Sequence, residues 1–147
     1  MTIKTIGRAR GLIIHHDKAL VMKRIKNGAI YYTLCGGKLE PHETPEHGCI
    51  REIFEETSLH VTIEKQIFYA SDIFDNIENH HFIFLCRYHT GEAKLNGEEI
   101  DRMTQDNQYI PTWIMIDEIP NLCFKPDVIA QGLIDYLSNQ KNTLTQQ

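Results

Sequence analysis

The segment from Gly37 to Leu59, GKLEPHETPEHGCIREIFEETSL, constrains the structure of this chain more than any other. Thr44 is a suitable N-cap, and Pro45 fits the first helical position. Glu46 places an acid in the first turn, where the helix dipole favours negative charge. These residues predict a helix that begins near Pro45.

The predicted helix has two contrasting faces. At about 100° per residue, the carboxylates of Glu52, Glu55 and Glu56 cluster on one side, with Gly48 clearing space one turn before Glu52. Like charges at these spacings destabilise a helix by a few tenths of a kcal/mol per pair, so a bound cation would stabilise this face. The opposite face is predicted to enter the core and carries Cys49, Ile50, Ile53, Phe54 and Thr57.

Mg²⁺ is the cation that suits this acidic face. It prefers carboxylate and water oxygens and keeps its sites open to substrate phosphates, and Mn²⁺ is an alternative ion. A merely solvated acidic face is the simpler interpretation. The neighbouring residues favour the metal, because Arg51 adjoins Glu52, Glu43 lies eight residues before Arg51, and the Gly36-Gly37 pair precedes Glu43.

At these positions the chain resembles the Nudix hydrolases, whose box reads G-x5-E-x7-R-E-U-x-E-E-x-G-U with U a bulky aliphatic residue. Ser58 replaces the late glycine, where a left-handed non-glycine residue costs about 1 kcal/mol without touching the chemistry. The matching positions are Gly37, Glu43, Arg51, Glu52, Ile53, Glu55, Glu56 and Leu59.

The resemblance implies roles for the matching residues. Glu52, Glu55 and Glu56 would hold the metal, and Glu52 or Glu56 would polarise the attacking water. Arg51 would orient Glu43 through a charge-assisted fork. A loop in which the backbone approaches the metal or a phosphate is expected at Gly36, Gly37, Lys38 and Leu39.

Few basic residues are available to contact a substrate phosphate. Lys23, Arg24 and Lys38 are the candidates we select, and Arg8 and Arg10 complete the set. Solvent-facing charges at a strand end are the alternative for Lys23 and Arg24.

Nudix enzymes often take a further carboxylate from a loop after the sheet. In this chain we expect Glu99, with Glu98 and the more distant Asp106 as alternatives. An acidic surface turn is the competing interpretation of this segment.

Hydrophobic patterning predicts an α/β (α+β) fold with the order strands, helix, strands, helix. The resemblance implies an α/β/α sandwich around a mixed sheet. We expect a single domain over 1–147 with a frayed tail over 138–147. The expected strands are 11–16 and 19–23 as a hairpin, 31–35, 60–70, 81–88 and 113–116, and the last helix is 126–137.

Composition narrows the functional class. A net charge of -5 argues against stable nucleic-acid binding, and the chain lacks an apolar stretch of membrane-spanning length or a signal peptide, so we expect a cytoplasmic protein that does not bind membranes. The four cysteines form no CxxC pair and are expected to be buried free thiols. The adjacent pairs His15-His16 and His80-His81 are expected at the core edge or the surface.

The implied reaction is Mg²⁺-dependent hydrolysis of the diphosphate linkage in a nucleoside diphosphate linked to a group X, with a small-molecule nucleotide as substrate. The lack of accessory segments favours a MutT-type nucleoside triphosphate pyrophosphohydrolase. An ADP-ribose or nucleotide-sugar pyrophosphatase and a non-catalytic nucleotide-sensing module are the alternatives. Homodimers are common in the family, so a dimer is one alternative to a monomer.

Overall fold

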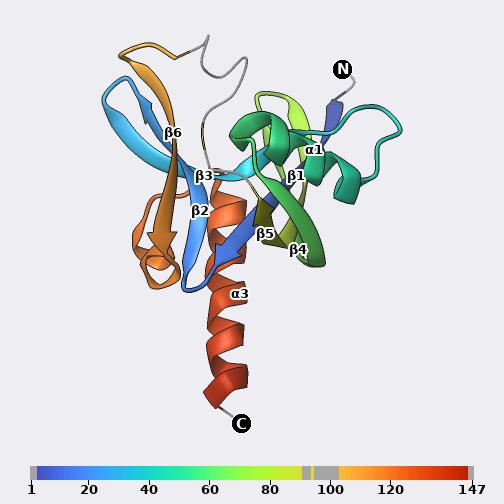
Figure 1. The fold of residues 1–147 in the computed structure, drawn as a ribbon. Helices are drawn as coiled ribbons and strands as arrows, with labels where there is room; N and C mark the ends of the chain where they lie inside the picture. The colour runs from blue at the N-terminus through green and yellow to red at the C-terminus, as the bar shows by residue number, and fades with distance from the viewer. Residues whose placement is uncertain (1–2, 91–93, 95–102, 146–147) are drawn as a thin grey trace.

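A six-stranded mixed sheet with a helix on each face forms the centre of the computed structural model, which describes residues 3–90, 94 and 103–145 (Figure 1). This confirms the predicted α/β class. The elements follow in the order β1 (Lys4–His15), β2 (Lys18–Lys26), β3 (Ala29–Lys38), α1 (Pro45–Thr57), β4 (His60–Phe74), β5 (Ile77–Thr90), β6 (Asn107–Met115), the 3-10 helix η1 (Ile116–Asn121) and α3 (Asp127–Thr145).

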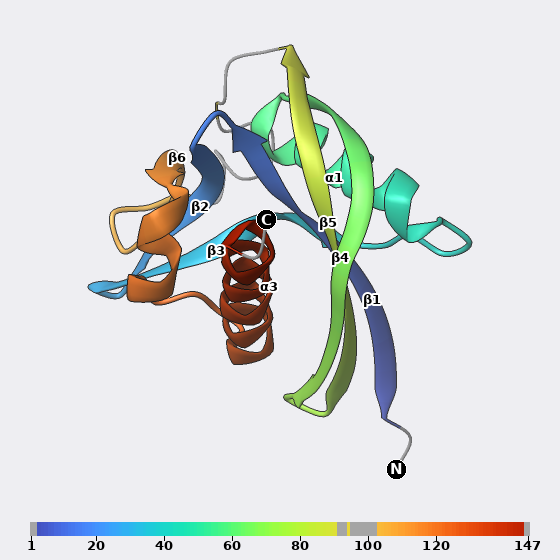
Figure 2. The ribbon, with the colours of Figure 1, turned by 90° about the horizontal axis from the view of Figure 1, so that it is seen from below.

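The strands lie in the order β4-β5-β1-β3-β2-β6, so the first strand is near the middle of the sheet. In Figure 2, β2 and β6 are seen to the left of α3, and β4 and β5 to its right. β1 runs parallel to β5 and antiparallel to both β2 and β3. The predicted β1-β2 hairpin is confirmed. Asn27 and Gly28 make the β2-β3 turn with φ values of 50° and 83°, which an Asn-Gly pair favours in tight hairpins.

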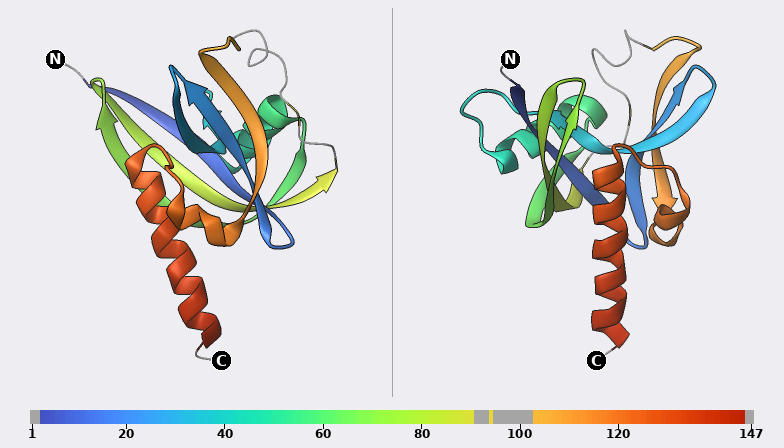
Figure 3. Two further views of the ribbon diagram at one scale, coloured as in Figure 1. Left: turned by 90° about the vertical axis from the view of Figure 1, so that its left-hand side faces the viewer. Right: turned by 180° about the vertical axis from the view of Figure 1, so that it is seen from behind.

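Side-chain alternation along the strands divides the core between the two faces of the sheet. Figure 3 shows α1 and α3 on opposite faces of the sheet. Ala9, Ile13 and Cys35 pack with the buried side of α1. Leu12, Leu34 and Ile83 face the other way, toward α3, whose Ile129 and Leu133 are fully buried. The two helices are therefore held on opposite faces, as a sandwich requires.

All six strands and α3 are longer than predicted. α3 continues to Thr145 instead of ending at Leu137, so the expectation of a frayed tail from Ser138 is wrong up to Thr145. No glycine or proline follows Gly132, and the polar residues there include good helix formers. β6 begins at Asn107, because it pairs with β2 along its whole length and its edge position tolerates Pro111.

Three burial expectations need correction. Phe54 is 41% exposed and lies against His60, with ring centroids 4.7 Å apart, instead of entering the core with Ile53. Cys123 is exposed, whereas the other three cysteines are buried free thiols as expected. His81 is only 2% exposed and so is neither an edge nor a surface residue.

None of the helices within residues 3–90, 94 and 103–145 combines the length and the apolar character needed to cross a bilayer.

Candidate active site

Local sequence fixes both ends of α1. The Oγ1 atom of Thr44 accepts a hydrogen bond from the backbone N–H of His47 at 3.2 Å, and Pro45 begins the helix, as predicted. At the other end Ser58 is left-handed with φ 67°, and its N–H donates to the carbonyl of Phe54 at 2.8 Å. These caps fix where α1 begins and ends.

A two-pronged ion pair joins Arg51 to Glu43, which is only 6% exposed. Nε of Arg51 donates to Oε2 of Glu43 at 2.7 Å, and Nη2 donates to Oε1 at 2.8 Å. These bonds lower the pKa of Glu43 to about 2, helped by the backbone N–H of Glu40. The pKa of Arg51 is raised by the same pairing. Glu43 is thus the carboxylate that Arg51 orients.

Arg51 also reaches two glutamates of the acidic face. Its Nη1 donates to Oε1 of Glu52 and to Oε2 of Glu55, each at 3.0 Å. Nη2 donates to the carbonyl of Lys38 at 3.2 Å. Burial raises the pKa of Glu52, and Arg51 opposes that rise. Part of the repulsion expected between the carboxylates is therefore relieved by the protein's own arginine.

The carboxylates of α1 were also tested as metal ligands. No group of three or more His, Cys, Asp or Glu side chains in the described parts of the chain is placed to hold a metal. The donors themselves fit a hard divalent ion, because Glu52, Glu55 and Glu56 offer carboxylate oxygens from one helix face. Arg51 contacts only one oxygen of Glu52 and one of Glu55, so the second oxygen of each carboxylate remains to bind an ion.

Gly36 and Gly37 belong to the end of β3 and not to a loop, which corrects the expectation for this pair. They pair with Arg10 and Ala9 of β1. A Cβ at Gly37 would lie 2.6 Å from Oε2 of Glu52, so this position must lack a side chain for Glu52 to lie there. Gly36 has φ 141°, and a Cβ on it would meet the carbonyl of Ala9 and come within 2.9 Å of Cγ of Arg10.

Gly48 has a different role from the one predicted. A Cβ there would collide with a methyl group of Leu39 and lie 2.8 Å from Oε1 of Glu43. The space beside Gly48 is therefore filled by Leu39 and Glu43 and is not open to a ligand.

Two of the basic residues selected from the sequence already make protein contacts. Arg24 donates to Oδ1 of Asn107 at 2.5 Å and to the carbonyl of Gln108 at 3.2 Å, and its guanidinium lies 3.7 Å from the centre of the Tyr109 ring. It thereby joins β2 to β6. Lys38 contributes its carbonyl to Arg51, and its side chain is exposed. Lys23 is half-buried in β2.

The downstream carboxylates remain predictions. Glu98 and Glu99 lie outside the described residues. Asp106 precedes β6, and its carbonyl accepts from the N–H of Asn27 at 2.8 Å. Asn27 belongs to the β2-β3 turn, which is at the opposite end of β3 from Gly37.

A cluster around Arg10 was not predicted from the sequence. Nη1 of Arg10 lies 3.1 Å from Nδ1 of His81, and Nε2 of His81 lies 3.2 Å from Oδ1 of Asp72. Burial and the nearby Arg8 lower the pKa of Arg10 to about 10, while Glu56, Asp72 and Glu52 act in the opposite direction. The sequence feature that could have revealed this cluster is the presence of polar residues at alternate positions in strands that are otherwise apolar.

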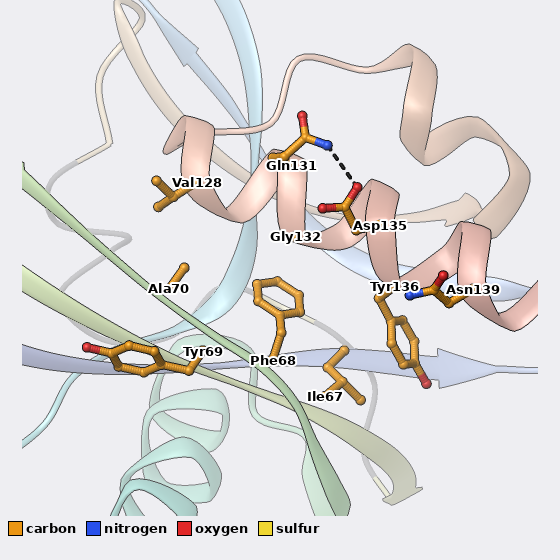
Figure 4. Close-up of a pocket in the computed structure, with 10 residues that line it drawn as sticks. All are labelled: Ile67, Phe68, Tyr69, Ala70, Val128, Gln131, Gly132, Asp135, Tyr136 and Asn139. Carbon is orange, nitrogen blue, oxygen red and sulfur yellow. Dashed lines mark hydrogen bonds between the residues drawn. The ribbon is translucent and has the colours of Figure 1, made fainter.

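A groove of about 400 Å³ lies between β4 and α3 (Figure 4). Phe68 and Ala70 line it from the strand, and Gly132 and Tyr136 line it from the helix. Ala70 is opposite His81 in the β4-β5 register, so the groove adjoins the cluster around Arg10. Its volume is in the range of small-molecule sites.

Comparison with known proteins identifies the family. The NUDIX domain profile matches residues 5–131. A MutT-like protein of Streptomyces ambofaciens is 39% identical over 56 residues, which are 37% of this chain and 35% of that protein, so the match spans about a third of the relative's length.

Two solved structures share the fold. The MutT protein from Methanosarcina mazei Go1 has a TM-score of 0.76 and 19% identity, covering 96% of this chain and 99% of that one. An ADP-ribose pyrophosphatase from Streptococcus suis 89-1591 has a TM-score of 0.60 and 17% identity, covering 92% and 91%. With the profile match over most of its length and the box residues on α1, the chain belongs to the NUDIX family of hydrolases.

Proposed function

We propose that the chain hydrolyses the diphosphate linkage of a nucleoside diphosphate linked to a group X, in a reaction that depends on Mg²⁺. The observation that carries this proposal is the arrangement on α1, where Arg51 holds Glu43 by a two-pronged ion pair beside the carboxylates of Glu52 and Glu55. A helix face that gathers several carboxylates suits a phosphate-metal site, because a divalent ion would neutralise charges that otherwise repel one another.

Nucleoside triphosphates are the substrate class we favour, with pyrophosphate as one product. The MutT-like relative and the MutT structure support this choice. The similarity to an ADP-ribose pyrophosphatase keeps ADP-ribose or a nucleotide sugar as the second candidate. A nucleotide sensor without activity is the third, and the presence of every box glutamate weighs against it.

The residues of α1 divide the chemistry between them. Glu52, Glu55 and Glu56 would hold Mg²⁺, which when bound neutralises phosphate charge and makes bound water more acidic. Glu52 or Glu56 would accept the proton of the attacking water. Arg51 would keep Glu43 and the α1 carboxylates in place, since its fork fixes direction as well as charge.

A product-resolved screen tests the proposal. The purified chain would be incubated with Mg²⁺ and separately with nucleoside triphosphates, ADP-ribose, nucleotide sugars and dinucleoside polyphosphates. We expect a nucleoside monophosphate and pyrophosphate from the triphosphates. Two monophosphate products from ADP-ribose alone would select the second candidate, and thermal stabilisation by a nucleotide without any product would select the sensor.

Substitution of Glu56 by Gln provides the matched test of the site. Removing one carboxylate charge should cut turnover by orders of magnitude and leave the circular dichroism spectrum unchanged, because Gln keeps the size and shape of the half-buried Glu56 side chain. Glu118→Gln, at an exposed position in η1, is the control and should keep full activity. Near-normal turnover of Glu56→Gln would show that the assignment is wrong.

A further inference from the structure

Five polar side chains face the same side of the sheet as α3. Arg8 and Arg10 alternate along β1, Asn79 and His81 alternate along β5, and Asp72 of β4 is opposite Asn79 in the register. The next residues on this face of β1 and β5 are apolar: Leu12 and Ile83 belong to the core beneath α3. This face thus changes from apolar to polar toward the start of β1.

The hydrogen bonds of this cluster have a defined direction. Arginine carries only donors, so Arg10 donates to Nδ1 of His81. Nδ1 must then lack a proton, and Nε2 carries it and donates to Oδ1 of Asp72. Because His81 is only 2% exposed, water competes little for either bond. The neutral imidazole therefore positions the Arg10 guanidinium without neutralising its positive charge.

Arg10 is also close to the acidic face of α1. Its Cγ lies beside Gly36, and Oε2 of Glu52 lies beside Gly37, so consecutive residues of β3 separate the two groups. Glu52 and Glu56 both act electrostatically on Arg10. A divalent ion bound by these glutamates would neutralise them, and of the three carboxylates that act on Arg10 only Asp72 would then remain to balance Arg8 and Arg10. A phosphate of the substrate would balance the second positive charge.

We propose that Arg10 binds a phosphate of the substrate, and that His81 and Asp72 are positioning residues that aim its guanidinium. This inference rests on the proposed function, since a substrate with a diphosphate linkage supplies the anion. Arg8, which donates through Nε to Oδ1 of Asn79 at 3.0 Å, is held on the same face and adds to the positive charge.

Replacement of Arg10 tests the binding step. Arg10→Met keeps the apolar stem and removes the charge, and Arg10→Lys keeps the charge without the planar fork. We expect kcat/KM to fall about 10- to 100-fold for Arg10→Met, as for a lost hydrogen bond to a charged group, and less for Arg10→Lys. Arg87→Met, which removes one exposed positive charge elsewhere on β5, should stay within about twofold of wild type.

The same measurement with four nucleoside triphosphates separates a phosphate contact from a base contact. A phosphate contact predicts the same loss for all four bases. A loss confined to one base would show that Arg10 recognises the base, and this would overturn the proposal.

A double-mutant cycle tests the positioning role. His81→Leu should weaken catalysis less than Arg10→Met, and His81→Gln, whose amide can accept from Arg10 and donate to Asp72, should recover part of the loss. Arg10→Met/His81→Leu should be no worse than Arg10→Met alone, because His81 acts through Arg10. If the fold-losses in kcat/KM of the two single variants multiply in the double variant, the positioning role is overturned. Thermal melts of each variant identify any loss that comes from unfolding.

Binding of a nucleoside triphosphate analogue with methylene bridges, measured by calorimetry with Mg²⁺, separates this inference from the proposed function. If wild type hydrolyses the substrate, and Arg10→Met has the same kcat/KM and the same affinity for the analogue, only the inference is overturned. Analogue binding that depends on Arg10 without hydrolysis overturns only the proposed function. If wild type neither hydrolyses nor binds, both are overturned.

Discussion

Glu43 shows how one neighbour sets the charge state of a single residue. Two hydrogen bonds from Arg51, at 2.7 and 2.8 Å, favour the ionised carboxylate and lower its pKa from 4.5 to about 2. A group whose folded pKa lies below its unfolded value stabilises the fold above the unfolded pKa. The stabilisation is lost as the pH falls through the folded pKa.

The lowered pKa of Glu43 predicts how the stability of Glu43→Gln depends on pH. The variant should be less stable than wild type at pH 7, and this difference in stability should narrow as the pH falls from about 4.5 and close below about pH 2, where Glu43 of wild type is protonated as well. Urea unfolding at several pH values measures it. A gap that stayed constant over this range would mean that the ion pair does not stabilise the fold.

The resemblance to the Nudix box implied the contact between Arg51 and Glu43, whereas nothing in the sequence predicted the contacts of Arg10. Arg51 and Glu43 are eight residues apart, within one helix and the segment that leads into it, so local geometry brings them together. Arg10 and His81 are 71 residues apart and meet only because β1 and β5 pair in one particular parallel register. No local pattern specifies that register.

At the level of elements, the C-terminal end of α1 carries a correctable strain. Ser58 is left-handed with φ 67°, a conformation that glycine adopts without penalty. Ser58→Gly should raise the free energy of unfolding by up to about 1 kcal/mol. Chemical denaturation measures the change, with activity as a check that the site is intact.

A serine of α3 supplies the matched control for Ser58. Ser138 is exposed in the interior of the helix, so Ser138→Gly should lower the free energy of unfolding by a few tenths of a kcal/mol. The same substitution thus has opposite signs at the two positions. A destabilising Ser58→Gly would show that the serine side chain contributes more than its backbone strain costs.

The ends of elements differ in how well the sequence defines them. The start of α1 was predicted because Thr44 and Pro45 act within one turn. The end of α3 was not, since no residue near Leu137 breaks a helix and polarity alone was a poor guide. The extent of β6 depends on pairing with β2, a distant partner whose length sets how far the strand continues.

For the whole molecule, metal binding and stability should be linked. An ion that binds only the folded chain at about 100 times its Kd adds about 2.7 kcal/mol, which raises Tm by several degrees. We expect Mg²⁺ to raise the Tm of wild type relative to EDTA and to have little effect on the double variant Glu52→Gln/Glu56→Gln. An equal rise in Tm for wild type and for the double variant would show that the ion binds elsewhere.

The class of the fold was predicted better than its topology. Hydrophobic alternation and the two helices were enough to indicate a mixed sheet between helices. The position of β1 between β5 and β3 was not accessible, because it depends on a parallel pairing that closes a long stretch of chain. The same pairing brings Arg8 and Arg10 to the side of the sheet that carries α3.

The glycine pair of β3 makes the sheet unusually thin at one point. A sheet normally insulates the groups on its two faces with a layer of side chains, and at Gly36 and Gly37 that layer is missing. Cγ of Arg10 lies against Gly36 on one face, and Oε2 of Glu52 lies against Gly37 on the other. A side chain at Gly36 would therefore displace Arg10, and a side chain at Gly37 would displace Glu52, so the pair makes room for one functional group on each face.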